Sequence, residues 1–189
     1  MTLAAIILAA GASRRFGTDE KLKAQINGRT VLDAAIAATE GLDQRIVVTR
    51  AQTPAPDGVR VIVNPDADAG MGWSLALGVA SLDLCDGVFV VLGDMPLIPQ
   101  EVYRQLADHL TGSDIVVPTH KGRDGHPVLF AAACFDDLRA LSGDTGARGL
   151  ITGGRYRVLR LEVGTEAIVQ DIDTKDDLTA LINPSKRPV

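Results

Sequence analysis

The sequence predicts an α/β fold built on a mostly parallel sheet. Segments with the character of buried strands alternate along the chain with segments of helical periodicity, and this alternation is typical of parallel sheets covered by helices. The strand segments are rich in β-branched residues and nearly continuous in apolar character, as expected for strands covered on both faces. No internal repeat or low-complexity linker divides the 189 residues, so we expect a single domain over residues 1–189.

Four strands and two helices are predicted in the first hundred residues. A helix over Val31–Thr39 follows from apolar residues that recur on one helical face. A short apolar helix over Ser74–Ser81 has Ser74 as its expected N-cap. The predicted strands are Leu3–Leu8, Arg45–Thr49, Val59–Val63 and Val88–Leu92.

The rest of the chain continues the alternation. Pro99 suits the first position of a helix, in which apolar residues then repeat every four positions. Thr174 is the expected cap of a last helix over Lys175–Ile182, which has two acidic residues in its first turn. The segment His120–Phe130, rich in glycine and charge, is predicted as an excursion near the functional site, and residues 183–189 as a frayed tail. The strands here are Ile115–Pro118 and Tyr156–Leu161.

Composition and charge argue against several classes of function. Hydrophobic residues make up 46% of the chain and charged residues 23%, which is ordinary for a soluble globular protein. Aromatic residues reach only 4%, so stacking platforms for single-stranded nucleic acid are not expected. The net charge of −5 argues against binding to nucleic acid or to an anionic membrane. Within this acidic chain, a local basic cluster indicates a small anionic ligand: Arg14, Arg15, Lys21 and Lys23.

The cysteines and the N-terminal run point to a cytoplasmic protein. Cys85 and Cys134 lack CxxC spacing, so neither a zinc site nor a redox pair is indicated, and both are expected to be buried small hydrophobic residues. The apolar run near the N-terminus resembles the core of a secretory signal peptide. However, no Lys or Arg precedes Ala12, where a signal peptide carries its positive charge. We therefore expect no leader and a cytoplasmic localisation.

The turn after the first predicted strand has the features of a phosphate-binding loop. The strand feeds the small-residue segment Ala9–Gly17, and Lys21 follows four residues later. A buried strand that ends in such a turn leaves backbone N–H groups free to converge on an anion. The turn lacks the GxxxxGK[ST] pattern of P-loop ATPases. It also lacks GxGxxG, because Gly11 and Gly17 are six residues apart.

Two acidic segments predict a metal site. Gly93-Asp94 follows a hydrophobic strand directly, which places the Asp94 carboxylate at the carboxyl edge of the sheet, where α/β folds bind their ligands. One carboxylate together with substrate phosphates is a common way to hold Mg²⁺. Further along the chain, alternation in an extended stretch puts Asp171 and Asp173 on one face, so that one of them can complete the site with Asp94.

Three glycine-containing loops supply further candidates. Gly70 and Gly72 precede a short helix and let a ligand approach the backbone, and Ser74 can donate to a phosphate or ribose oxygen. Arg123 and His126 lie in the glycine-rich excursion and are predicted to contact an anionic acceptor. A third turn carries an arginine: Gly143–Arg148.

The order and spacing of these motifs resemble the MobA-like nucleotidyltransferases related to molybdenum cofactor biosynthesis. Leu8–Gly17 with Lys21 looks like the signature loop of that family, and Gly93–Pro96 looks like its metal-binding turn. The resemblance extends from about Leu3 to Leu178. Further segments are similar to the molybdenum cofactor cytidylyltransferase branch: Gly70–Leu75, Gly125–Pro127, Gly143–Arg148 and Asp171–Thr174.

The resemblance implies both a fold and a reaction. The fold would be three-layered and Rossmann-like, of the nucleotidyltransferase type, with residues 1–100 mainly binding nucleotide and residues 101–182 mainly binding acceptor. In the reaction, a terminal phosphate of the acceptor attacks the α-phosphate of a nucleoside triphosphate, and Mg²⁺-bound pyrophosphate leaves. No general base is required, because an acceptor phosphate is already ionised at neutral pH.

The resemblance also implies roles for individual residues. Lys21 and Arg15 would act in catalysis by neutralising the triphosphate as charge develops on the leaving pyrophosphate. Asp94 and Asp173 would hold Mg²⁺. The nucleotide would be bound by Leu8, Ala9, Ala10, Gly11, Ser13, Arg14, Gly72 and Ser74.

The choice of nucleotide rests on one residue. Family members that use CTP resemble Leu-Ala-Ala-Gly at the signature loop, whereas the guanylyl branch resembles Leu-Ala-Gly-Gly. Ala10 therefore favours CTP over GTP, since its methyl group leaves less room for a purine. Trp73 departs from the pattern, because relatives often carry a small or polar residue there, and this puts the acceptor in doubt.

The leading hypothesis is a Mg²⁺-dependent cytidylyltransferase with a molybdopterin-type acceptor and, as a further partner, a molybdoenzyme client. One alternative is a guanylyltransferase that uses GTP. Another keeps the reaction and changes the acceptor to a sugar phosphate or an isoprenoid precursor phosphate. A third, from a different class, is a non-catalytic carrier of molybdenum cofactor. An oxidoreductase that binds a dinucleotide is disfavoured, because its glycine fingerprint is absent.

Overall fold

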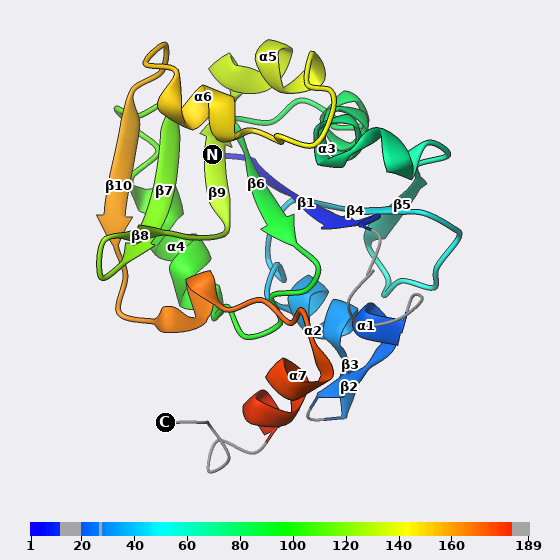
Figure 1. The fold of residues 1–189 in the computed structure, drawn as a ribbon. Helices are drawn as coiled ribbons and strands as arrows, with labels where there is room; N and C mark the ends of the chain where they lie inside the picture. The colour runs from blue at the N-terminus through cyan, green and yellow to red at the C-terminus, as the bar shows by residue number, and fades with distance from the viewer. Residues whose placement is uncertain (12–19, 27, 183–189) are drawn as a thin grey trace.

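The computed structural model describes residues 1–11, 20–26 and 28–182, and within them an eight-stranded sheet forms the centre of the protein. Along the sheet the order is β10-β7-β9-β6-β1-β4-β5, and β8 pairs with the carboxyl-terminal end of β7 (Figure 1). The strands are β1 (Leu3–Ala9), β4 (Gln44–Thr49), β5 (Val59–Val63), β6 (Gly87–Leu92), β7 (Ile115–His120), β8 (Arg123–Asp124), β9 (Val128–Ala131) and β10 (Val158–Glu162).

Most neighbouring strands run parallel. The pairs β5–β4, β4–β1 and β1–β6 are parallel, and so is the pair β7–β10. Strand β9 lies between β6 and β7 and is antiparallel to both, and β8 is antiparallel to β7. The predicted α/β fold with a mostly parallel sheet is therefore confirmed.

Helices cover both faces of this sheet (Figure 1). Apolar residues of α2 and α4 pack on one face, and apolar residues of α3 and α5 pack on the other. A short hairpin of β2 (Gln25–Ile26) and β3 (Arg29–Thr30) lies apart from the main sheet. The helices are α1 (Glu20–Lys23), α2 (Val31–Ala37), α3 (Met71–Ala80), α4 (Gln100–Asp108), α5 (Phe135–Arg139), α6 (Arg148–Thr152) and α7 (Lys175–Ile182).

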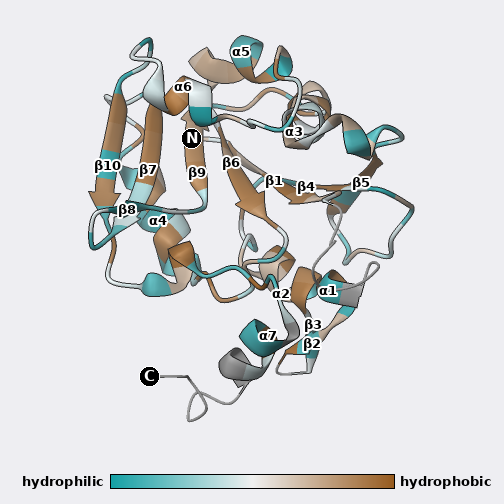
Figure 2. Cartoon of the chain, in the orientation of Figure 1, coloured by the Kyte–Doolittle hydropathy of each residue, from teal (hydrophilic) through white to brown (hydrophobic). Residues whose placement is uncertain are grey.

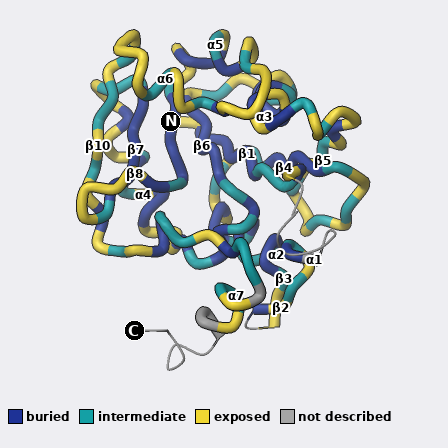
Figure 3. The backbone as a smooth tube through the Cα atoms, viewed as in Figure 1, coloured by how far each residue is buried: buried dark blue, intermediate teal, exposed yellow. Residues whose placement is uncertain are grey.

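Strand β1 shows why an apolar run forms a central strand here. Leu3, Ala5 and Ile7 face the cluster that contains α2 and α4, whereas Ala4 and Ile6 face the cluster that contains α3 and α5. Successive side chains of a strand point to opposite faces, so both faces of β1 need apolar residues. The central strands are accordingly hydrophobic in Figure 2 and buried in Figure 3.

Two helix starts differ from the prediction. Ser74 was predicted to cap its helix, which is wrong: α3 begins at Met71, Gly70 is its N-cap, and Ser74 lies inside it. Gly70 has φ 106°, a left-handed backbone that favours glycine and lets the chain turn into the helix one turn early. Pro99 is the N-cap of α4 rather than its first helical residue, because its ψ of 148° is still extended. The predicted cap at Thr174 is confirmed, since its Oγ1 accepts from the Asp177 N–H at 3.1 Å.

The segment His120–Phe130 is more regular than predicted. It holds the end of β7, the strand β8 and most of β9. Lys121 and Gly122, with φ 51° and 76°, make the tight turn between β7 and β8, a conformation that suits a two-residue hairpin connection. The sequence analysis predicted an excursion here and missed the strands β8 and β9, because they are short and antiparallel. The predicted tail, residues 183–189, lies outside the described residues.

Neither cysteine forms a disulfide. Cys134 is buried and Cys85 is half-buried, and both are free thiols. Burial raises the pKa of the Cys134 thiol to about 11, so the group is a neutral, unreactive part of the core. In the part of the chain that the structure describes, no helix has the length and apolar character to cross a membrane.

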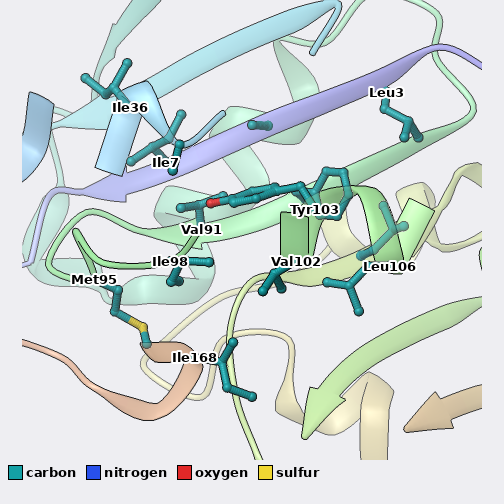
Figure 4. Packing of buried hydrophobic residues seen from close by; sticks show 14 of the residues in the cluster. Leu3, Ile7, Ile36, Val91, Met95, Ile98, Val102, Tyr103, Leu106 and Ile168 are labelled. Carbon is teal, nitrogen blue, oxygen red and sulfur yellow. The ribbon is translucent and has the colours of Figure 1, made fainter. Parts of the chain in front are cut away.

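Tyr103 is an irregularity in the core on the α4 face. Its side chain lies among the apolar residues of that cluster (Figure 4), and its ring makes an edge contact with Phe89 at a centroid distance of 5.1 Å. Among the described residues its buried hydroxyl has no hydrogen-bond partner. Burial raises the pKa of Tyr103 well above its ordinary value. The phenol is therefore neutral, and its polar oxygen destabilises the core.

Replacing Tyr103 with Phe is expected to stabilise the protein by about 1 kcal/mol, because an unsatisfied buried hydroxyl costs about that much or more. The measurement is the free energy of unfolding in urea. Tyr156→Phe is the matched control: its hydroxyl donates to Asp137 Oδ2 at 2.8 Å, so its loss should not stabilise. A Tyr103→Phe variant no more stable than the parent would show that the hydroxyl is satisfied.

Candidate functional site

A cavity of about 610 Å³ opens at the carboxyl edge of the central parallel strands. Ala9 of β1 pairs with Thr49 of β4, and Leu8 of β1 pairs with Leu92 of β6, so the three strands end together. Open α/β sheets bind ligands at this edge. The walls come from both halves of the chain: Leu8, Ala9, Ala10, Gly11, Lys21, Leu22, Arg50, Ala67, Asp68, Gly70, Met71, Ser74, Leu92, Asp94, Asp144 and Asp173.

Lys21 joins two carboxylates inside this cavity. Its Nζ donates to Asp94 Oδ2 at 2.7 Å and to Asp173 Oδ1 at 2.9 Å. The lysine side chain is only 8% exposed, whereas the side chains of Asp94 and Asp173 are 26% and 42% exposed. The structure thus brings together three residues predicted from distant parts of the sequence. It also pairs the lysine with the two predicted metal ligands, which the sequence analysis did not foresee.

The contacts with the two carboxylates keep the Lys21 side chain protonated. Burial by itself lowers the pKa of the ammonium group. The hydrogen bonds to Asp173 and Asp94, together with the two negative charges, outweigh burial and hold the pKa above its ordinary value. Lys21 is therefore positively charged at neutral pH and at any pH at which the protein would be assayed.

Backbone contacts place Asp94 and Asp173 side by side. The Gly93 N–H donates to the Leu8 carbonyl at 2.9 Å, and a Cβ at Gly93 would lie only 3.0 Å from that oxygen. Glycine therefore fits the turn that carries Asp94 without the crowding that any larger residue would cause. The Asp94 carbonyl accepts from the Ile172 N–H at 3.0 Å, which ties the segment before α7 to the same turn.

Asp177 fixes the backbone around Asp173 through hydrogen bonds. Its Oδ2 accepts from the backbone N–H groups of Asp173 at 3.0 Å and Thr174 at 2.7 Å, and from the Thr174 hydroxyl at 2.8 Å. Burial raises the pKa of Asp177, but these hydrogen bonds outweigh burial and lower it overall. Asp177 is therefore ionised at neutral pH and fixes the backbone on which Asp173 stands.

The segment that contains Ile172 and Leu178 is anchored beside α1 by apolar packing. Ile172 is fully buried in a small cluster with Ile26 and Val31, and Leu22 and Leu178 pack against it. Figure 1 shows α7 beside α1 and the β2–β3 hairpin. This packing is what brings the acidic segment near residue 173 to the lysine of α1.

The carboxylates form a group that could hold a metal ion. One oxygen each from Asp94, Asp171 and Asp173 lies within 4.8 Å of the others. Three carboxylate oxygens are a fitting donor set for a hard divalent cation such as Mg²⁺ or Mn²⁺. Three carboxylates also outnumber the single lysine ammonium, so a divalent ion would be favoured electrostatically. Asp171, which the sequence analysis left as one of two options, thus joins both predicted ligands.

A loop from the second half of the chain closes the side of the cavity near α3. The Gly72 N–H donates to the Gly143 carbonyl at 2.8 Å, and a Cβ at Gly72 would lie 2.8 Å from the Ser142 carbonyl. A Cβ at Gly70 would overlap the backbone of Gly143. These two glycines therefore let the loop approach α3, and the loop delivers Asp144 to the cavity wall. Gly72 itself does not line the cavity.

Ser74 is buried in the cavity wall. Its Oγ accepts from the Asn64 amide at 2.9 Å, and Asn64 in turn accepts from the Asp66 N–H at 2.9 Å. Since the Ser74 oxygen is the acceptor of that bond, its hydrogen can still be donated to a ligand. The structure thus places Ser74 where the predicted contact to a nucleotide is possible.

The other residues predicted from the signature loop fall into two groups. Leu8, Ala9, Ala10 and Gly11, which were predicted to bind nucleotide, line the cavity. Three others lie outside the described residues: Ser13, Arg14 and Arg15.

The two predicted acceptor contacts do not line the cavity. Arg123 is exposed on β8. His126 is half-buried beside β6, and its Nδ1 has no hydrogen-bond partner among the described residues. Burial lowers the pKa of His126, while a backbone hydrogen bond at Val90 and the charges of Asp94 and Asp171 act in the opposite direction. The imidazole thus lies within the electrostatic influence of the acidic group.

Sequence reasoning missed several residues of the wall. Arg50 directly follows β4 and pairs with Asp68, with Nη2 2.7 Å from Oδ1. The rule that ligands bind at the carboxyl ends of parallel strands could have found Arg50, because it stands one residue beyond a predicted strand. Met71 and Asp144 lie in the predicted segments Gly70–Leu75 and Gly143–Arg148, but neither was given a role of its own, since the packing of a distant loop brings them together.

Comparisons with known proteins agree on one family. The family model described as the MobA-like NTP transferase domain matches residues 5–160. The purine catabolism protein PucB of Bacillus subtilis (strain 168) is 28% identical over 93% of both chains. The molybdenum cofactor cytidylyltransferase of Escherichia coli (strain K12) is 28% identical over 91% of both chains. The molybdenum cofactor guanylyltransferase of Acidiphilium cryptum (strain JF-5) is 33% identical over 94% of this chain and 93% of its own.

Solved structures show the same fold. Rv0371c from Mycobacterium tuberculosis H37Rv superposes with a TM-score of 0.85 at 31% identity, covering 96% of this chain and 97% of the other. A complex of Rv0371c with manganese gives a TM-score of 0.78 at 30% identity, covering 96% and 98%. These matches confirm the predicted fold of nucleotidyltransferase type.

Proposed function

Because the chain belongs to the family of MobA-like NTP transferase domains, we propose that this nucleotidyltransferase transfers CMP from CTP to a molybdopterin-type acceptor and releases pyrophosphate. The observation that carries the proposal is the cavity that holds Lys21 against Asp94 and Asp173 at the sheet edge. Two relatives that the chain matches over nine-tenths of its length are named for nucleotidyl transfer to molybdenum cofactor.

The proposed reaction is a substitution at phosphorus. A terminal phosphate oxygen of the acceptor attacks the α-phosphorus of CTP, a new P–O bond forms, and the bond to the β-phosphate breaks. Both electrons of the broken bond leave with pyrophosphate. The attacking phosphate is already ionised, so the protein contributes positioning and charge neutralisation rather than a base.

The residues divide this work between them. Lys21, with Arg15, donates to the triphosphate and neutralises charge on the leaving pyrophosphate. Mg²⁺ held by Asp94 and Asp173 would supply further neutralisation of the triphosphate. The backbone of the turn through Gly11, with Ser13 and Arg14, binds phosphates. The nucleoside end would contact Leu8, Ala9, Ala10 and Ser74 in the cavity, while Gly72 acts by admitting the loop that carries Asp144. Arg123 and His126 do not line the cavity and would contact a part of the acceptor that extends beyond it.

The preference for CTP rests on Ala10. This residue lines the cavity and is 3% exposed, so its methyl group is packed and cannot move aside for a larger base. A smaller cavity beside the base favours a pyrimidine. The 33% identity to a guanylyltransferase makes GTP the competing nucleotide.

The experiment that tests the proposal measures pyrophosphate release. The protein is incubated with Mg²⁺ and each of CTP, GTP, UTP and ATP, with molybdenum cofactor, with a sugar phosphate, with an isoprenoid precursor phosphate, or with no acceptor. We expect release with CTP that requires molybdenum cofactor, and slower release with GTP.

Each other outcome points to a specific alternative. Release that is faster with GTP identifies a guanylyltransferase. Release with another phosphorylated acceptor retains the reaction and changes the substrate. If the protein binds molybdenum cofactor but no nucleotide supports release, a non-catalytic carrier explains it better. A molybdoenzyme client would then be sought as the partner that receives the cofactor.

A further inference from the structure

Lys21 contacts two of the three carboxylates of the acidic group. Its Nζ lies 2.7 Å from Asp94 Oδ2 and 2.9 Å from Asp173 Oδ1, and both residues belong to the group that could hold a metal ion. Its side chain is 8% exposed, so the ammonium has exchanged most of its hydration for these two carboxylates. Leaving them without a replacement partner would be costly.

A metal ion held by Asp94 and Asp173 would compete with this ammonium group for the same two carboxylates. A divalent ion such as Mg²⁺ would have to approach their oxygens to about 2.1 Å. Two cations brought that close to one pair of carboxylates would displace one another, because Nζ already hydrogen-bonds to both. The two like charges would also repel each other.

We propose that Lys21 is the resident cation of the metal site, and that it must leave Asp94 and Asp173 before a divalent ion can bind there tightly. The inference rests on the proposed function for the place to which the ammonium moves, namely the triphosphate of the bound nucleotide. Lys21 then serves two partners in turn. It balances the carboxylates in the nucleotide-free protein and the phosphates in the complex.

This exchange ties metal binding to the substrate. In the nucleotide-free protein, a metal ion must displace a hydrogen-bonded ammonium, so its affinity is low. When the ammonium turns to phosphate oxygens, Asp94 Oδ2 and Asp173 Oδ1 become available at no further cost. By linkage, anything that draws Lys21 away from the carboxylates strengthens metal binding.

The carboxylates are positioned independently of Lys21. The turn that carries Asp94 is fixed by the Gly93 N–H to Leu8 carbonyl bond, and the Asp94 carbonyl accepts from Ile172. The backbone N–H groups of Asp173 and Thr174 donate to Asp177, which fixes the position of Asp173. Removing the ammonium therefore leaves a preformed set of oxygens rather than a collapsed site.

The test measures the affinity of the nucleotide-free protein for Mn²⁺, with electron paramagnetic resonance as the readout of binding. Lys21→Met removes the ammonium and keeps an unbranched side chain that is one atom shorter. We expect it to bind Mn²⁺ about tenfold more tightly, or better, because the ion no longer competes with two charge-assisted hydrogen bonds. Lys21→Arg keeps a cation at the site and should retain the weak binding of the parent.

Two controls separate this result from a general effect of charge. Lys23→Met removes an equal charge from the exposed end of the same helix and should change Mn²⁺ affinity by less than about twofold. Adding Asp94→Asn to Lys21→Met should abolish the gain, which locates the ion at the acidic group. As a second readout, Mn²⁺ should raise the unfolding midpoint of Lys21→Met by more than that of the parent.

The inference is overturned if Lys21→Met binds Mn²⁺ no more tightly than the parent, or if Lys23→Met gains as much. Neither result depends on catalysis. A parent protein that transfers no nucleotide would remove the proposed function, while tight Mn²⁺ binding by Lys21→Met would still establish Lys21 as the competing cation. Conversely, active parent protein with unchanged Mn²⁺ affinity in Lys21→Met would refute only this inference.

Discussion

Lys21→Met is expected to lower kcat for nucleotidyl transfer by about 10²–10³, the usual cost of removing one group that stabilises charge in a transition state. The loss should appear chiefly in kcat, because negative charge on the pyrophosphate increases as the α-phosphate bond breaks. The measurement is steady-state pyrophosphate release with CTP and acceptor at saturating Mg²⁺.

Two features make this prediction specific. The same variant should bind metal more tightly while it turns over more slowly, a combination that general unfolding cannot produce. Lys21→Arg should recover part of the rate, and Lys23→Met should behave like the parent. A Lys21→Met enzyme within tenfold of the parent kcat would contradict the role proposed for this lysine.

Asp94→Ala is expected to reduce activity by about 10³ and to raise the Mg²⁺ concentration needed for half-maximal rate. A lost carboxylate ligand weakens the metal site directly, and Asp94 is the most enclosed of the three acidic residues. The substitution should leave the fold intact, since the Asp94 backbone carbonyl still accepts from Ile172. The measurement is the rate as a function of Mg²⁺ concentration, with the unfolding midpoint as a check on folding.

Asp171→Asn provides the matched comparison for Asp94→Ala. Asp171 belongs to the same acidic group but is exposed, so water can replace it and the expected loss is smaller. Equal losses in both variants would mean that the group acts through its total charge rather than through Asp94 as a ligand. An Asp94→Ala enzyme with normal Mg²⁺ dependence would exclude this metal site.

The strands were predictable because apolar periodicity carries the information directly. Val59–Val63 matches β5 at both ends, and the other five predicted strands lie within two residues of observed ones. The short antiparallel strands β8 and β9 were missed, since four residues or fewer give too little periodicity. The start of α3 was misplaced because the deciding feature is the backbone of Gly70, not the capping side chain of Ser74.

The candidate site was predictable in its members but not in their contacts. The two acidic segments predicted Asp94 and Asp173 together as metal ligands, and the basic cluster identified Lys21 separately. That Lys21 pairs with both carboxylates depends on the apolar cluster that joins Ile172, just before α7, and Leu178 of α7 to Leu22 of α1, which no local pattern encodes. For the same reason the sequence singled out the turn Gly143–Arg148 but not the role of Asp144 in the wall, because Asp144 reaches the cavity through a loop that Gly70 and Gly72 admit.

The most direct test of the central claim follows the α-phosphate of the nucleotide. CTP labelled at the α-phosphorus is incubated with the protein, Mg²⁺ and molybdenum cofactor, and the products are separated. We expect the label to become attached to the acceptor in step with pyrophosphate release, and we expect Asp94→Ala and Lys21→Met to suppress both. Label that appears only as free CMP, or remains in CTP while the cofactor is bound, would contradict this expectation.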